Sequence, residues 1–241
     1  MQKFLPLLCV LTSAAFPAWG SNDITNLGAL SQPEFHALSE DLGSALSYKP
    51  VTPAEPLGTT GYDMGVEVTQ TNTTASSQSW SKITGSGMVV TDLNIPKLHV
   101  AKGLPLGIDI AAFYSKIPTT NISLFGGELR YAIVQGGPAE PAVAIRGAFT
   151  KMVGVTQLAL NTKSLDLSAS QRFAAFTPYV GIGRVWVDSM PNVGPTLQSE
   201  SFTQGKVFFG ANLNLIVTNL AAEWDKTGSA RSVSLKLGFR F

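Results

Sequence analysis

From Thr59 to the end of the chain, apolar and polar residues alternate at every second position. The last segment shows the pattern most clearly, because Val233, Leu235 and Leu237 alternate with serine, lysine and glycine. Successive side chains of a β-strand point to opposite faces, so a period of two predicts strands with one apolar and one polar face. A chain that repeats this pattern over 59–241 is restricted to a largely all-β fold.

Ten such segments are predicted, each about as long as the 9–11 residues that a tilted strand needs to cross a bilayer. Pro96 interrupts the second segment, which predicts either a bulge or a misplaced boundary. A turn at Asn161-Thr162 would split the sixth. Tight links alternate with longer polar ones at 71–85 and 188–203, as periplasmic turns alternate with external loops. The predicted strands are 60–72, 86–101, 104–116, 120–135, 141–152, 155–168, 176–188, 203–217, 218–226 and 230–241.

The composition agrees with strands that face lipid on one side. Hydrophobic residues make up 44% of the chain, charged residues only 14%, and the mean hydropathy is +0.18. Nevertheless, no apolar run after the N-terminus reaches the ~20 residues of a spanning helix. Lys and Arg total 17 against 16 acidic residues, so a nucleic-acid partner is not expected.

The first 20 residues have the features of a secretory signal peptide. Lys3 gives a positive start, Phe4–Ala15 is almost wholly apolar, and Ala18 and Gly20 put small residues at the −3 and −1 positions of a cleavage site. Cleavage there would remove Cys9, the single cysteine of the chain. Disulfides, cysteine catalysis and cysteine-bound metals are therefore not expected.

Segment 21–58 is predicted to form one short helix and a proline-containing linker. Ser31 and Glu34 have the spacing of a capping box. An apolar stripe at intervals of three and four then predicts a helix over 33–46. The segment is expected to lie in the periplasm or to plug whatever follows it. The stripe consists of Phe35, Leu38, Leu42 and Leu46, and the linker contains Pro50, Pro53 and Pro56.

The last strand resembles the C-terminal sorting signal of Gram-negative outer-membrane β-barrel proteins. Phe239 and the terminal Phe241 carry this resemblance, and the stretch from Pro178 to Gly183 is similar to strands of small outer-membrane barrels. The resemblance implies an outer-membrane location, lipid contact, and recognition by the barrel assembly machinery during insertion. Because a sheet in lipid must close, the expected fold is all-β: a closed antiparallel transmembrane barrel of about ten strands (8–12), spanning 59–241. A soluble periplasmic β-sandwich is the alternative.

Charged residues of both signs fall on the polar face of the predicted strands. Ionisable groups at membrane depth must point inward and pair or line water. We expect a network that fills the lumen or, alternatively, a narrow conduit with Glu128, Arg130 and Arg146 at its constriction. Arg184 fits either face. The candidate lumen-lining or binding residues are Asp63, Glu67, Asp109, Glu128, Arg130, Arg146, Lys206, Lys236 and Arg240.

No catalytic residue, cofactor or metal site is predicted. His36 lies on the helix and His99 on a polar face, and neither has neighbours at metal-ligand spacing. The predicted function is a narrow pore or carrier for small or apolar solutes, or a structural envelope protein. The alternatives are a lipid-modifying barrel enzyme with His99 as its base, and an adhesion barrel that uses the loops at 71–85 and 188–203.

Overall fold

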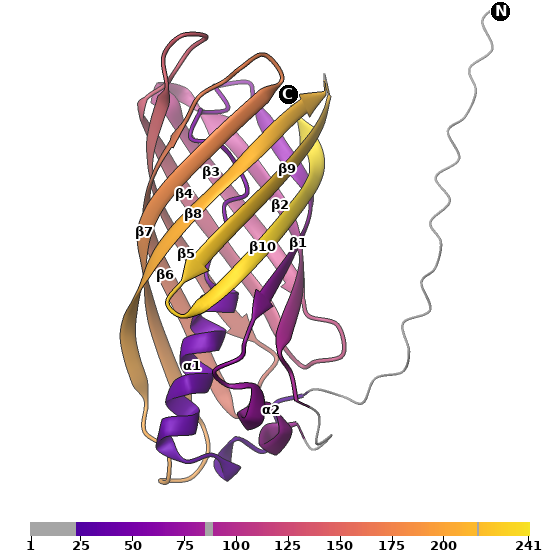
Figure 1. Ribbon diagram of the computed structural model, residues 1–241, viewed down its shortest axis with the longest axis vertical. Helices are drawn as coiled ribbons and strands as arrows, with labels where there is room; N and C mark the ends of the chain where they lie inside the picture. The colour runs from indigo at the N-terminus through magenta and orange to yellow at the C-terminus, as the bar shows by residue number, and fades with distance from the viewer. Residues whose placement is uncertain (1–22, 85–88, 216) are drawn as a thin grey trace, which may run out of the picture.

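The computed structural model describes residues 23–84, 89–215 and 217–241, so the predicted signal peptide lies outside the described residues. Ten strands form a closed antiparallel barrel in which β1 pairs with both β2 and β10 (Figure 1). The predicted fold class is confirmed, and the sixth strand is not split. The strands are β1 (Tyr62–Asn72), β2 (Asp92–Leu104), β3 (Ile108–Lys116), β4 (Ser123–Val134), β5 (Ala142–Val153), β6 (Leu158–Ser170), β7 (Phe176–Pro191), β8 (Glu200–Leu215), β9 (Thr218–Thr227) and β10 (Ala230–Arg240).

The outer surface of the barrel is a belt of exposed apolar side chains. Along β10, residues alternate strictly between buried and exposed, and Leu235 is 61% exposed. Leu98 and Ile182 are each 60% exposed on the same lipid-facing surface. Among the described residues, no helix is long and apolar enough to cross a membrane. A closed sheet with such a belt satisfies its own backbone hydrogen bonds in lipid, so the protein is a transmembrane β-barrel.

The two ends of the barrel differ in their connections. The end that holds Tyr62 and Phe241 carries short links, including the single turn η2 (Pro105–Gly107) between β2 and β3. The opposite end carries the longest link, 73–91, which contains α2 (Ser77–Ile83). Short turns mark the periplasmic end of such barrels. We therefore call the end with Phe241 the periplasmic end and the end with α2 the outer end.

The second predicted strand had the wrong boundary, and Pro96 is not at a bulge. Of the predicted segment before Asp92, residues 89–91 lie in the link that contains α2, and residues 86–88 lie outside the described residues. Pro96 lies inside β2 opposite Val68, but pairing of β2 with β3 begins only at Leu98. Pro96 therefore occupies an edge position, where the missing amide proton is tolerated.

The N-terminal segment lies inside the barrel. α1 (Gln32–Leu46) occupies the outer end, and residues 47–58 run through the lumen to the periplasmic end, where β1 begins (Figure 1). The capping box forms, since the Ser31 amide donates to Glu34 Oε2 at 2.9 Å. Gly43 allows close packing, because a Cβ there would lie 2.6 Å from Val187 Cγ2 of β7. We call residues 32–58 the plug.

The outer half of the barrel interior is a hydrophobic core built around α1. The apolar stripe of α1 is fully buried, and Leu38 and Leu42 are both 0% exposed. It packs with inward-facing residues of the wall and with α2 and η1 (Leu27–Ala29), which close the outer end. Wall residues in this core include Ile95, Phe113, Leu124, Leu160, Val185 and Val187.

The large aromatic residues Trp80 and Tyr179 are buried inside the molecule rather than exposed at a membrane interface. Trp80 belongs to α2 and is 0% exposed, because it packs in the core that closes the outer end. Tyr179 faces the lumen and is 4% exposed. Side chains alternate between the two faces of β7, so the inward position of Tyr179 places Arg184 on the outer, exposed face.

The path of the plug predicts that the residues before α1 are accessible from outside the cell. Ala29 is exposed beside the outer end, whereas Ala139 is exposed in the β4–β5 link at the periplasmic end. In intact cells, Ala29→Cys should react with a membrane-impermeant maleimide, and Ala139→Cys should react only after the outer membrane is permeabilised. The reverse labelling pattern would show that the ends are assigned the wrong way round.

Candidate functional site

The polar half of the lumen is the candidate site, and the structure brings the predicted residues together there. Eight of the nine candidates are at most 9% exposed and lie on the inner face of the wall. Arg240 is half-buried at the periplasmic end. Besides placing these side chains inside, the structure shows what each one binds.

Six buried ion pairs cross the described part of the lumen. Five of them join two wall residues, and the sixth joins Lys49 of the plug to Asp225 of β9 at 2.8 Å. The wall is therefore nearly balanced in charge by itself, as buried ionic groups require. The wall pairs are Glu67–Lys97 (2.5 Å), Asp109–Arg130 (2.5 Å), Glu128–Arg146 (2.7 Å), Asp166–Lys206 (3.0 Å) and Asp63–Lys236 (2.5 Å).

Strand register and one glycine bring these partners together. Glu67 lies directly opposite Lys97, and Asp109 lies directly opposite Arg130, so both pairs join neighbouring strands. Asp166 and Lys206 instead lie on either side of β7, and each is opposite Gly183. A Cβ at Gly183 would lie 2.1 Å from the Asp166 carboxylate. The absence of a side chain there lets the ion pair form across the strand.

The charged wall residues also bind the backbone of the plug. Arg130 donates to the Pro53 carbonyl at 2.5 Å, and Lys206 donates to the Tyr48 carbonyl at 2.8 Å. Asp109 accepts the Leu57 amide at 3.1 Å. An extended chain has no internal hydrogen bonds, so its buried backbone groups need such partners. Further contacts are Lys97 to the Lys49 carbonyl, Arg240 to the Glu55 carbonyl, the Val51 amide to Glu223, and the Ala54 amide to Ser170.

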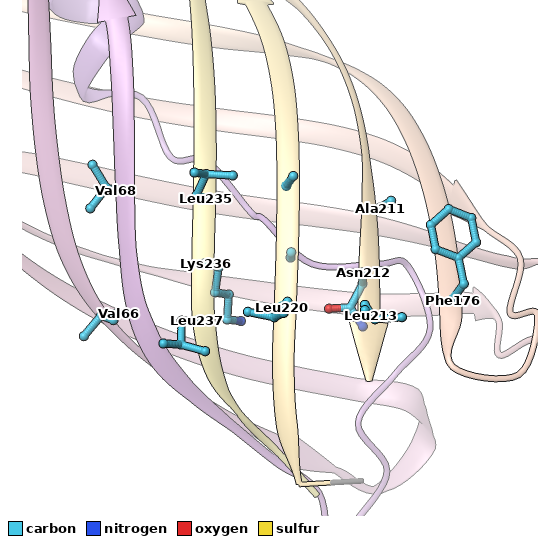
Figure 2. A pocket seen from close by; sticks show the side chains of 12 residues that line it. Val66, Val68, Phe176, Ala211, Asn212, Leu213, Leu220, Leu235, Lys236 and Leu237 are labelled. Atoms are coloured by element: carbon cyan, nitrogen blue, oxygen red, sulfur yellow. The ribbon is translucent and has the colours of Figure 1, made fainter. Parts of the chain in front are cut away.

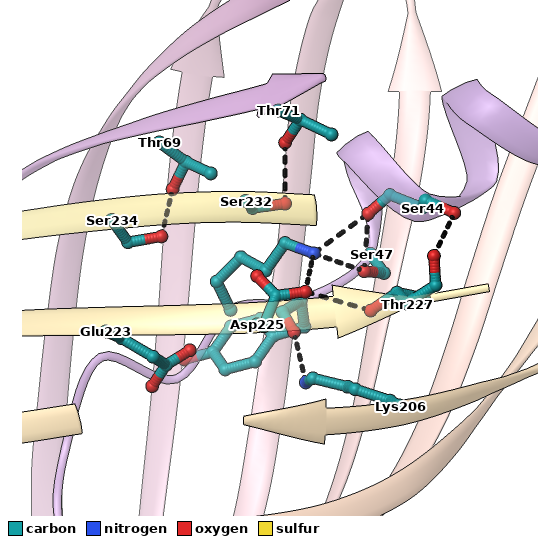
Figure 3. Close-up of polar contacts among 12 residues, drawn as sticks. Ser44, Ser47, Thr69, Thr71, Lys206, Glu223, Asp225, Thr227, Ser232 and Ser234 are labelled. Carbon is teal, nitrogen blue, oxygen red and sulfur yellow. Dashed lines mark hydrogen bonds and ion pairs between the residues drawn. The ribbon is translucent and has the colours of Figure 1, made fainter. Parts of the chain in front are cut away.

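Lys49 anchors the point where α1 passes into the extended linker. Its ammonium donates to Asp225, to the Ser44 carbonyl at 2.9 Å and to the Ser47 hydroxyl at 3.1 Å. In Figure 3, the Ser44 hydroxyl donates to the Thr227 carbonyl of β9, and the Thr227 hydroxyl donates to the Asp225 carboxylate. All three ammonium protons therefore have acceptors, and the last turn of α1 is tied to the wall.

Polar contacts also hold α1 at the outer end. The Ser39 and Ser189 hydroxyls are 2.8 Å apart, and the Asp41 carboxylate accepts from both the amide and the hydroxyl of Ser76, each at 2.8 Å. Burial raises the pKa of Asp41 above its usual value, although the bonds from Ser76 oppose this. On the exposed side, a hydrogen bond from Lys82 helps to lower the pKa of Glu34 to about 2.

Sequence reasoning missed Lys49, Tyr48 and Asp225. Asp225 was detectable, since it lies two residues after Glu223 on the same face of β9. Lys49 and Tyr48 stand beside Pro50 in a linker without periodicity, so no pattern marked them. His99 is also buried: its Nε2 is 3.3 Å from the Tyr48 hydroxyl and its Nδ1 is 3.6 Å from Glu67. The plug therefore covers the histidine that the enzyme alternative needs.

One small cavity in the described interior lies between the plug and the wall. The cavity between Tyr48, Lys97 and Phe113 has a volume of about 20 Å³, which is room for about one water molecule. No group of three His, Cys, Asp or Glu residues within the described ranges is arranged to hold a metal ion.

A larger hollow lies on the lipid-facing side of β8, β9 and β10 (Figure 2). Its volume is about 540 Å³, and it forms where Ala211 lies opposite Ala222 between larger apolar side chains. Leu213, Leu220 and Leu237 form part of its rim. Since these residues face the bilayer, the hollow is surrounded by the acyl chains of lipids.

No protein-family model matches the chain, and a search of curated proteins found no match. Among solved structures, Neisserial surface protein A is similar at 12% identity and a TM-score of 0.30, over 75% of this chain and 95% of that one. The translocator domain of the autotransporter NalP from Neisseria meningitidis matches at 10% identity and a TM-score of 0.35, over 82% and 91%. A loop-deleted OmpT, an outer membrane protein of Vibrio cholerae, matches at 12% identity and a TM-score of 0.32, over 62% of this chain. The chain spans 54% of that OmpT chain.

Proposed function

We propose that the protein is a closed, non-conducting barrel of the outer membrane, whose polar lumen holds its own N-terminal segment rather than a solute. This is the structural envelope role among the functions that the sequence suggested. The observation that carries it is the set of hydrogen bonds from wall residues to the plug backbone between Tyr48 and Leu57. The lumen charges are already used by the plug and by each other.

The outer half of the lumen supports the same conclusion for a different reason. Withdrawal of α1 would expose the apolar wall residues Phe113, Leu160 and Val187 to water. Exposure of apolar surface costs about 25 cal/mol per Å². A pore that opens by releasing this helix would therefore lose a whole hydrophobic core, which favours a plug that stays in place.

Planar-bilayer recordings test the proposal. The full-length protein should give no single-channel steps, while a general porin reconstituted in the same bilayers should conduct. Reproducible steps from the full-length protein would support the pore function and contradict the closed barrel.

A cysteine pair separates a permanently closed barrel from a gated one. Ser39→Cys/Ser189→Cys replaces two hydroxyls that are 2.8 Å apart and so can link α1 to β7. If the barrel is closed, the reduced and oxidised forms should both be silent, as should each single variant. Steps that appear on reduction and vanish on oxidation would instead show that release of α1 opens a pore.

A further inference from the structure

Six cations project from the outer half of the lipid-facing surface without partners. All are exposed, and within the described ranges none forms an ion pair or a hydrogen bond through its side chain. Charged side chains at membrane depth are normally turned inward or paired. These residues are Lys116 of β3, Lys151 of β5, Lys163 of β6, Arg184 of β7, Lys226 of β9 and Arg231 of β10.

Three of these cations form a continuous diagonal row on adjacent strands. Lys163 lies opposite Phe149, two residues from Lys151, and Arg184 lies opposite Leu165, two residues from Lys163. Diagonal neighbours of this kind are about 7–8 Å apart. The strands are tilted relative to the barrel axis (Figure 1), so two residues that lie directly opposite each other on neighbouring strands lie at different depths in the membrane. The two-residue offset between the cations opposes this difference in depth. The three cations therefore lie at a similar depth.

The surroundings of this row are those of the headgroup region. Lys163 lies between two exposed aromatic residues, Phe149 on β5 and Trp186 on β7. Exposed aromatics of barrels gather where acyl chains meet headgroups. Asp188 is also a diagonal neighbour of Lys163, because it lies two residues from Trp186. It accepts a hydrogen bond from Ser201 at 2.8 Å and forms no ion pair among the described residues. The row therefore presents, at the membrane interface, three cations without an ion-pair partner in the described part of the chain.

We propose that Lys151, Lys163 and Arg184 bind the phosphate groups of a phosphorylated lipid in the outer leaflet. The Arg184 guanidinium can bind a phosphate through two parallel hydrogen bonds, and the lysines add point charges beside it. The apolar residues on the periplasmic side of the row, Leu165 and Ile182, are exposed and face the acyl chains of the same lipid. Like charges so close on one face repel each other, and an anionic headgroup removes that repulsion.

Native mass spectrometry of the full-length protein in detergent, titrated with a diphosphorylated lipid A, tests the proposal. The variant Lys151→Gln/Lys163→Gln/Arg184→Gln should bind roughly tenfold to a hundredfold more weakly than the unchanged protein, because each cation near an anionic lipid contributes about fivefold. All three positions are exposed, and heat-modifiable gel migration should show that the variant barrel is folded.

A second triple variant removes the same charge elsewhere. Lys116→Gln/Lys226→Gln/Arg231→Gln changes three other exposed cations near the outer end and should bind the lipid almost normally. Equal losses in both variants would show a general charge effect and overturn the site. Equally tight binding of a dephosphorylated lipid A would also overturn it. Free pyrophosphate should bind far more weakly than the lipid, and equal binding would assign the row to a soluble anion instead.

Discussion

Arg130→Met should destabilise the barrel by about 3–5 kcal/mol, because it leaves the buried carboxylate of Asp109 without its counter-ion. Arg130 is 2% exposed and donates to Asp109 through Nε at 3.0 Å and Nη2 at 2.5 Å. It also binds the Pro53 carbonyl, so the same change removes a partner from the plug backbone. The free energy of unfolding, measured by reversible urea denaturation in lipid vesicles, checks this.

The double variant Asp109→Leu/Arg130→Met is the matched control. Replacement of a whole buried ion pair by apolar residues is often nearly neutral, whereas removal of one partner is costly. The double variant should therefore recover most of the stability lost in the single one, although the Leu57 amide still loses its acceptor. If Arg130→Met alone were as stable as the unchanged protein, the result would mean that Arg130 is surrounded by water and is not held by Asp109.

Phe35→Ala should destabilise the protein by about 3–5 kcal/mol, since it empties a fully buried site. Phe35 is 0% exposed and begins the apolar stripe by which α1 packs into the outer half of the barrel. The loss should fall on the plug first, so we expect faster cleavage of residues 32–58 by externally added protease. Urea denaturation measures the stability, and mass spectrometry of the digest locates the cut.

Phe125→Ala provides the comparison for that change. Phe125 lies on β4 with 40% of its surface exposed on the lipid-facing side. Acyl chains can fill the space that its ring leaves, so the cost should be clearly smaller and the plug should stay protected. Equal effects of the two substitutions would show that α1 is not held by a hydrophobic core.

Much of the barrel could be predicted from the sequence because each strand carries its own signal. The alternation from Val233 to Phe239 indicates which side chains face lipid, and this indication does not depend on which strands lie next to it. All ten predicted strands exist, and the start of β2 is the boundary that differs most. The helix of the plug was also predictable, since the capping box and the stripe of α1 are local patterns. The same alternation predicted which charged side chains point into the lumen.

What the plug does could not be predicted, because its contacts join residues far apart in the chain. Lys49 and Asp225 are 176 positions apart, and neither belongs to a motif. The linker 47–58 has no periodicity, so its path through the lumen depends on a closed wall that supplies hydrogen bonds from several strands. The tertiary structure also decided the side of Arg184, because the inward packing of Tyr179 sets the parity of β7.

The sequence by itself therefore determined strands with one apolar and one polar, charged face, because alternation is a local property of each strand, and the resemblance of the last strand implied that they close into a barrel. Only the tertiary structure decided that the lumen is filled by the chain's own N-terminal segment. The physical reason is that a buried extended backbone must find donors and acceptors, and these exist only after the wall has closed around it.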